Sequence, residues 1–173
     1  MFVQFYLTPE SMSLFESLYY GELQSKFIDY WKAVASRFAN NPYVLGYDPL
    51  NEPFPSNMYT DPSLIYEPGR FDRATLQPFY KNIFQEAYLP SSNSKRMFFE
   101  AAQFPDFFGM YGGIIFNLGF TEAPGGAQYS NIQVLNDHTY CCEVSVDMCA
   151  NGEPPLDQAD TCRKFHEKRL TTR

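Results

Sequence analysis

The chain has 173 residues, of which 45% are hydrophobic and 18% aromatic, and it carries a formal net charge of −7. This composition predicts a folded domain with a substantial core rather than a disordered chain. The acidic balance argues against nucleic-acid binding, which needs clustered lysine and arginine side chains. No apolar run approaches the roughly 18 residues of a membrane-spanning helix, and the first residues do not have the pattern of a secretory signal peptide.

The first half of the chain predicts a helix, a strand and a long loop. Apolar residues recur at helical spacing over 23–38, and Asn40-Asn41-Pro42 ends that helix. Residues 44–47 follow as a buried strand, apolar without alternation, as in a parallel sheet that is covered on both faces. A loop over 54–71 comes next, and loops of such length are more often functional than filler.

The second half continues the alternation of helices and strands. A second helix is expected from residue 75 until Pro90 and the polar residues after it end it. Strands are expected over 97–99 and 132–135, and the charged tail over 157–169 begins another helix. This order predicts an α/β fold that is built from consecutive βα units.

Each predicted strand leads into side chains that are capable of chemistry. The first runs into Asn51-Glu52-Pro53, the second ends at Glu100, and the third leads to His138 and Tyr140. A glutamate at the carboxyl end of a strand, with an amide beside it, is a candidate general acid/base, although a polar strand exit is the alternative. The catalytic face of a (β/α)8 barrel presents such strand ends, but the chain is shorter than the roughly 250 residues of a whole barrel.

The cysteines cluster in the last third of the chain. They are Cys141, Cys142, Cys149 and Cys162. Clustering in a loop-like stretch favours disulfides in an oxidising compartment, and three pairings are possible. Zinc binding, with His138 or His166, is the alternative, but the spacing fits no usual zinc site. Disulfides without a signal peptide indicate that the chain is part of a longer protein.

Several segments resemble glycoside hydrolase family five. Residues 46–53 are similar to its strand-four signature, whose Asn-Glu-Pro glutamate is the acid/base, and residues 138–140 are similar to its His-x-Tyr pair after strand six. Three further stretches resemble the endoglycoceramidase branch, which cleaves between the glycan and the ceramide of glycosphingolipids. These stretches are residues 99–106, 119–126 and 134–142.

The resemblance implies that residues 1–173 form part of a (β/α)8 TIM barrel, about strands four to six with flanking helices. The first strands and the strand that carries the nucleophile would be missing. It also implies retaining hydrolysis of an O-glycosyl bond, with Glu52 as acid/base and Asn51 bonded to the sugar 2-hydroxyl. His138 and Tyr140 would line the cleaved subsite. No cofactor and no metal enter this chemistry.

The resemblance is incomplete where the nucleophile is concerned. In the family it is a second glutamate after strand seven, whereas Glu143, Glu153 and Glu167 follow no predicted strand. We therefore expect a glycosidase-like chain that is inactive alone and would need a complementing chain for the missing units. Two alternatives stay open: a cellulase- or β-glucosidase-like enzyme on soluble glycans, and a non-catalytic glycan- or glycolipid-binding remnant. The full-length protein is expected to be secreted or to lie in a lysosomal or vacuolar lumen.

Overall fold

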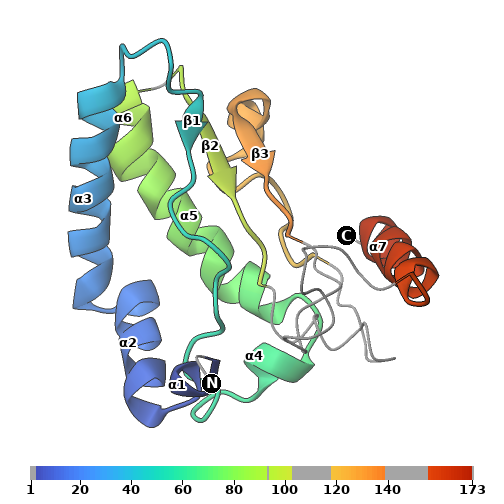
Figure 1. The fold of residues 1–173 in the computed structure, drawn as a ribbon. Coiled ribbons are helices and arrows are strands. Elements are labelled where there is room, and N and C mark those ends of the chain that lie inside the picture. The colour runs from blue at the N-terminus through green and yellow to red at the C-terminus, as the bar shows by residue number, and fades with distance from the viewer. Residues whose placement is uncertain (1–2, 93, 103–117, 139–155, 173) are drawn as a thin grey trace.

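The computed structural model describes residues 3–92, 94–102, 118–138 and 156–172. Within these ranges, three strands form one parallel sheet in the order β1-β2-β3 (Figure 1). The strands are β1 (Gly46–Tyr47), β2 (Arg96–Phe99) and β3 (Gln133–Leu135). Because neighbours in sequence are neighbours in the sheet and all run parallel, the predicted α/β organisation is confirmed.

Strand β1 is shorter than the predicted range of 44–47. The ammonium group of Lys95 donates hydrogen bonds to the carbonyls of Asn41 and Val44, at 2.6 and 2.7 Å, so Val44 is held by a side chain rather than by the sheet. At Gly46 the backbone of β2 comes so close that an added Cβ would lie 2.2 Å from the carbonyl oxygen of Arg96. Glycine is therefore needed where β1 and β2 approach each other.

Two helices lie before residue 23, and hydrophobic spacing did not reveal either of them. They are α1 (Val3–Tyr6) and α2 (Pro9–Tyr20). Thr8 caps α2, because its hydroxyl oxygen accepts a hydrogen bond from the backbone N–H of Ser11 at 3.3 Å, and Pro9 follows in the first helical position. These capping residues were the signal that could have located the helix.

Helix α3 (Glu22–Phe38) confirms the first predicted helix. Its apolar side buries Ile28 and Ala35, and it packs along the long helix that precedes β2. Figure 1 shows both helices running beside the sheet. Among the described residues, no helix has both the length and the apolar character needed to cross a membrane.

The long helix before β2 starts at Asp72, and it continues past Pro90 instead of ending there. Its successive parts are the π-helical segment η1 (Asp72–Leu76), α5 (Gln77–Ile83), the π-helical segment η2 (Phe84–Tyr88) and α6 (Leu89–Ser92). Each π-helical segment ends two residues before a proline, Pro78 or Pro90. Proline lacks an N–H and its ring clashes with the carbonyl four residues earlier, and a wider turn relieves both problems.

The core lies between this long helix, α3 and the sheet. Its fully buried members include Tyr80 and Ile83 of α5, Ala35 of α3 and Met97 of β2. Burying a large apolar side chain contributes about 1.5–3 kcal/mol, so these contacts hold the strands in register. The strand ends beyond the core are thereby fixed in space.

The remaining elements are short, apart from the C-terminal helix. They are α4 (Ser63–Tyr66), the 3-10 helix η4 (Ala127–Ile132) and α7 (Ala159–Thr172). Helix α4 lies within the predicted long loop, and α7 confirms the predicted tail helix. Figure 1 shows α7 beyond β3, on the side away from α3.

Candidate active site

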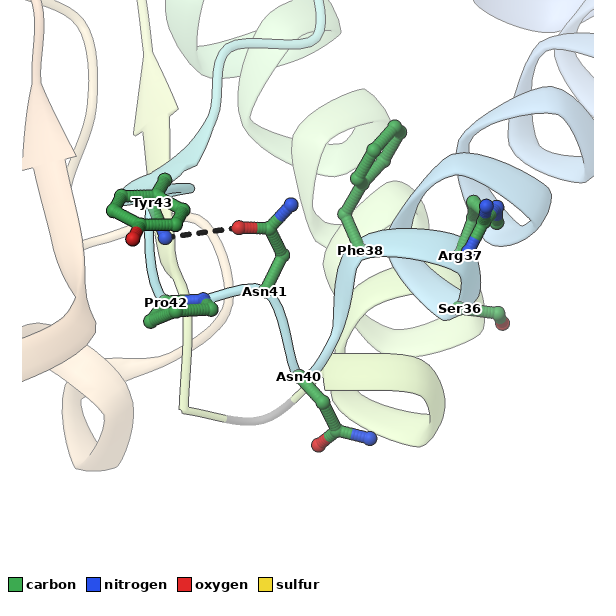
Figure 2. Close-up of a pocket in the computed structure, with 7 residues that line it drawn as sticks. All are labelled: Ser36, Arg37, Phe38, Asn40, Asn41, Pro42 and Tyr43. Carbon is green, nitrogen blue, oxygen red and sulfur yellow. Dashed lines mark hydrogen bonds between the residues drawn. The ribbon is translucent and has the colours of Figure 1, made fainter.

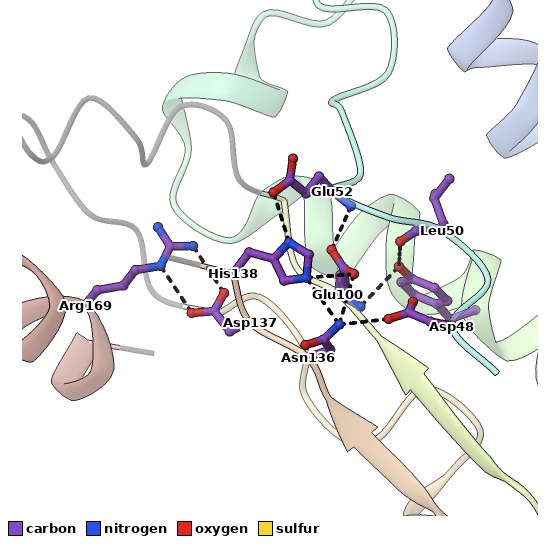
Figure 3. Close-up of polar contacts among 9 residues, drawn as sticks. Asp48, Leu50, Glu52, Glu100, Asn136, Asp137, His138 and Arg169 are labelled. Carbon is purple, nitrogen blue, oxygen red and sulfur yellow. Dashed lines mark hydrogen bonds and ion pairs between the residues drawn. The ribbon is translucent and has the colours of Figure 1, made fainter. Parts of the chain in front are cut away.

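Polar side chains from all three strand ends meet at the carboxyl edge of the sheet (Figure 3). Asp48 follows β1, Glu100 follows β2, and Asn136 and His138 follow β3. The Nδ2 atom of Asn136 lies 2.8 Å from Oδ2 of Asp48, 3.2 Å from Oε1 of Glu100 and 3.3 Å from Nε2 of His138. The structure thus brings side chains from all three strand ends together, and two of these four residues, Glu100 and His138, were predicted from the sequence.

Glu52 enters this cluster from the segment after β1. Its Oε1 lies 2.9 Å from Nδ1 of His138, and its carboxylate keeps about a third of its surface exposed. Its backbone has a φ of 47°, a left-handed conformation that is uncommon for a residue with a side chain. The sequence predicted the position of Glu52 at the strand end, but not this backbone conformation.

His138 lies between two carboxylates. Besides Nδ1 facing Glu52, its Nε2 lies 3.3 Å from Oε1 of Glu100. Partial burial by itself lowers the pKa of His138, but the hydrogen bond to Glu52 and the charges of Glu100, Glu52 and Asp48 outweigh it and raise the pKa. A protonated imidazole can donate to both carboxylates at once.

Glu100 is fully buried, and it has a different role from the other strand-end carboxylates. Its Oε2 accepts the backbone N–H of Glu52 at 2.7 Å. Burial raises the pKa of Glu100 to about 7, with a further rise from the charge of Asp48, while the bond from Glu52 and the charge of His138 act to lower it. A carboxyl group with this pKa exchanges its proton near neutral pH.

Two residues of the cluster, Asp48 and Asn136, were not singled out from the sequence. Both follow a predicted strand directly, and that position was the signal that could have identified them. Asn136 also donates its backbone N–H to the carbonyl of Phe99 at 2.9 Å, so the β2–β3 pairing continues to the site. Its amide is therefore placed by the sheet itself.

Of the other two predicted substrate-binding residues, one is described by the structure and lies outside the cluster. Asn51 is exposed and makes no hydrogen bond within the described ranges. Tyr140 lies outside the described residues, as do Glu143 and Glu153. Glu167 is described, but it lies on α7, where its exposed carboxylate pairs with Arg163, so it supplies no group to the cluster.

The predicted disulfides fall mostly outside the described part of the chain. Cys141, Cys142 and Cys149 are not described. Cys162 is buried on α7 and is not a free thiol. The pairing of the four cysteines stays a prediction.

An ion pair attaches α7 beside the site. The guanidinium group of Arg169 reaches both carboxylate oxygens of Asp137 at 3.2 Å, and the Arg169 side chain is buried. Asp137 immediately precedes His138. The ion pair thus ties the C-terminal helix to the residue that precedes His138 (Figure 3).

A surface hollow lies far from this cluster, at the turn between α3 and β1. Residues 36–38 and 40–43 line it, and the side chain of Asn41 accepts the backbone N–H of Tyr43 at 2.9 Å (Figure 2). Since it lies at the amino-terminal end of β1, opposite the strand ends that bear the carboxylates, it has no part in the candidate active site.

Similarity to solved structures defines the class of fold. The endo-glycoceramidase II of Rhodococcus sp. superimposes with a TM-score of 0.72 and 18% identity, over 99% of this chain and 35% of that protein. At this identity the likeness concerns the fold: this chain folds like one third of that enzyme. No family model matches the sequence.

Similarity in sequence is more specific. Over 138 residues the chain is 36% identical to the endoglycoceramidase of Hydra vulgaris and 33% identical to that of Cyanea nozakii. Each match covers 79% of this chain and 25% of the relative, so the chain spans about a quarter of these proteins. The resemblance to the endoglycoceramidase branch is therefore confirmed, and the chain is a partial endoglycoceramidase-like domain.

Proposed function

We propose that this chain contributes to a retaining glycoside hydrolase that releases the glycan from glycosphingolipids. The observation that carries the proposal is the partly exposed carboxylate of Glu52 at the carboxyl edge of a parallel sheet, held at 2.9 Å by His138. The name shared by the relatives, endoglycoceramidase, supports the substrate class. In this proposal β1, β2 and β3 are strands four, five and six of a (β/α)8 barrel.

Glu52 has the geometry of the acid/base in such a reaction. When protonated, it gives its proton to the glycosidic oxygen as the leaving group departs, and it then accepts a proton from the attacking water. The ring N–H of His138 orients the carboxylate while both steps take place. Asn51 is proposed to bond the sugar 2-hydroxyl, and Tyr140 to line the cleaved subsite.

The nucleophile of the proposed reaction is a second carboxylate about 5–5.5 Å from the first. Glu100 does not fit this role, because it is fully buried and its oxygens face the backbone of Glu52 and the side chains of Asn136 and His138. Glu167 is exposed on α7. We therefore assign the nucleophile to a carboxylate beyond the described residues, supplied by a longer chain or a complementing chain.

The compartment of the whole protein follows from the same proposal. Cysteine clustering favours an oxidising environment, and a glycosphingolipid-cleaving enzyme meets its substrate at membrane surfaces that face such a compartment. We propose secretion or a lysosomal or vacuolar lumen. Of two disulfides, one would then join Cys162 of α7 to the cysteine-bearing segment before the helix, and the other would close within that segment.

A chimera tests the activity directly. This chain replaces the aligned segment of the Hydra vulgaris relative, and release of glycan is measured from lactosylceramide micelles and, separately, from cellotetraose. We expect turnover of lactosylceramide. Glu52→Gln should reduce it by about 100-fold or more, because general acid/base catalysis contributes on that scale. Glu86→Gln is the matched control, since Glu86 is exposed on η2, far from the strand ends.

The outcomes separate the alternatives. Turnover of cellotetraose but not lactosylceramide would indicate an enzyme for soluble glycans. A folded chimera that binds lactosylceramide without cleaving it, while the unmodified Hydra protein cleaves it, would indicate a non-catalytic remnant. Full turnover in the Glu52→Gln variant would contradict the acid/base assignment.

A further inference from the structure

Glu100 is a fully buried carboxyl group for which the proposed reaction has no direct use. Burying such a group is costly unless hydrogen bonds compensate. Both of its oxygens have partners: Oε2 accepts the backbone N–H of Glu52, and Oε1 faces Nδ2 of Asn136 and Nε2 of His138. Those partners come from the segments after β1 and β3, so Glu100 connects the neighbouring strand ends.

The contact with Glu52 compensates for an unfavourable backbone conformation. Left-handed backbone at a residue with a side chain costs on the order of 1–3 kcal/mol and persists only where the surroundings impose it. The hydrogen bond to Glu100, at 2.7 Å, fixes the N–H of this residue. Pro53 follows directly and disfavours the right-handed helical alternative for Glu52.

Glu100 is itself held rigidly. Its backbone N–H donates to the hydroxyl of Tyr80 at 3.2 Å, and that hydroxyl donates to the carbonyl of Leu50 at 3.4 Å. Tyr80 is fully buried on α5. The long helix therefore supports both Glu100 and the segment that leads to Glu52.

We propose that Glu100 is a positioning residue for Glu52, acting through the Glu52 backbone with one carboxylate oxygen and through the imidazole of His138 with the other. The proposal rests on the acid/base role of Glu52 given above, and it deepens that role. Removing Glu100 would release the left-handed backbone and the ring that orients the reacting carboxylate. The reacting groups themselves would remain.

The charged groups around this contact determine how it responds to pH. Glu100 faces His138 from the β3 side and Asp48 from the β1 side, and His138 faces Glu52 as well. The Asp137–Arg169 ion pair lies beside His138 in the chain, because Asp137 is the preceding residue. Since the pKa of Glu100 is raised to about 7, its proton exchanges in a pH range that is accessible to NMR.

NMR on the 173-residue chain, recorded at concentrations below the onset of its self-association, tests the proposal without relying on activity. The first signal is the backbone amide proton of Glu52, which we expect to titrate near pH 7 together with the Glu100–His138 pair. The second is the imidazole of His138, with His166 as an internal reference, because the chain has two histidines. Glu100→Gln should greatly reduce the Glu52 amide titration and lower the pKa of His138, because the charge of Glu100 that raises it is gone, with His166 unchanged.

A second variant covers the case in which Glu100→Gln fails to fold. In His138→Gln the Glu52 amide should still titrate, but at higher pH, because the imidazolium charge that lowers the pKa of Glu100 is gone. The proposal is overturned if the Glu52 amide does not titrate in the unsubstituted chain, or if neither variant changes its titration. If the chimera were inactive but the NMR titrations behaved as expected, the proposed function would be contradicted, and the contact of Glu100 with Glu52 and His138 would not.

Discussion

At the scale of single residues, the site combines one strained and one buried acidic residue. Glu52 has a left-handed backbone and a partly exposed carboxylate, whereas Glu100 is buried and takes the N–H of Glu52. His138 contacts both. The two acidic side chains thus lie in different environments, one partly exposed and one buried, as the proposed acid/base and positioning roles require.

The raised pKa values of Glu100 and His138 predict how stability depends on pH. Between the ordinary value of 4.5 and about 7, the folded state keeps a proton on Glu100 that the unfolded state has released. His138, whose pKa is raised above 6.5, likewise binds its proton more tightly when folded. The free energy of unfolding should therefore fall as the pH rises from about 5 to about 8.

Urea unfolding midpoints across this pH range measure the effect. Glu100→Gln should flatten the dependence, because its side chain does not titrate, and Glu86→Gln should leave the slope unchanged. The lowered pKa values of Asp61 and Asp160 do not interfere, because the stability that they contribute is lost only in acid, below their ordinary value of 3.8. A midpoint that rises with pH would contradict the prediction.

At the scale of elements, the strands and most helices could be predicted from the sequence, because hydrophobic periodicity reports burial. Helical periodicity gave α3 and α5, short apolar runs gave β2 and β3, the charged tail gave α7, and the strand ends then indicated Glu52, Glu100 and His138. The continuation of the long helix through Pro90 could not be predicted, since the π-helical segment that accommodates it depends on packing against α3. The left-handed backbone of Glu52 could not be predicted either, because it is imposed by Glu100, which is distant in the sequence.

Helix α7 should depend in part on the buried ion pair between Arg169 and Asp137. In Arg169→Met the Asp137 carboxylate loses its bidentate partner in a mostly buried position, and breaking such pairs costs on the order of 3 kcal/mol. Hydrogen exchange should then show α7 amides opening before the rest of the chain, and the urea midpoint should fall. Arg163→Met, on the exposed side of the same helix, is the control and should change little. Equal behaviour of the two variants would show that the ion pair does not hold α7.

At the scale of the whole molecule, each outer strand of the described sheet is hydrogen-bonded to a neighbour along one edge only. Strands β1 and β3 both flank β2, and within the described ranges neither has a second neighbour. The relatives are about four times as long as the matched segment. In the proposed barrel, further strands would cover both edges, so the site would be complete only when they are present.

Produced alone, the 173-residue chain should therefore self-associate through its open sheet edges. Unpaired edges recruit other strands, and lysine on an edge opposes this. Leu45, which precedes β1 and is 64% exposed, is the position to change; Leu170, 70% exposed on α7, is the control. Sedimentation velocity at roughly micromolar to hundreds of micromolar concentrations should show association that Leu45→Lys weakens and Leu170→Lys does not. A monomer at every concentration, with a sharp cooperative melt, would mean that the open edges are protected without the remaining strands.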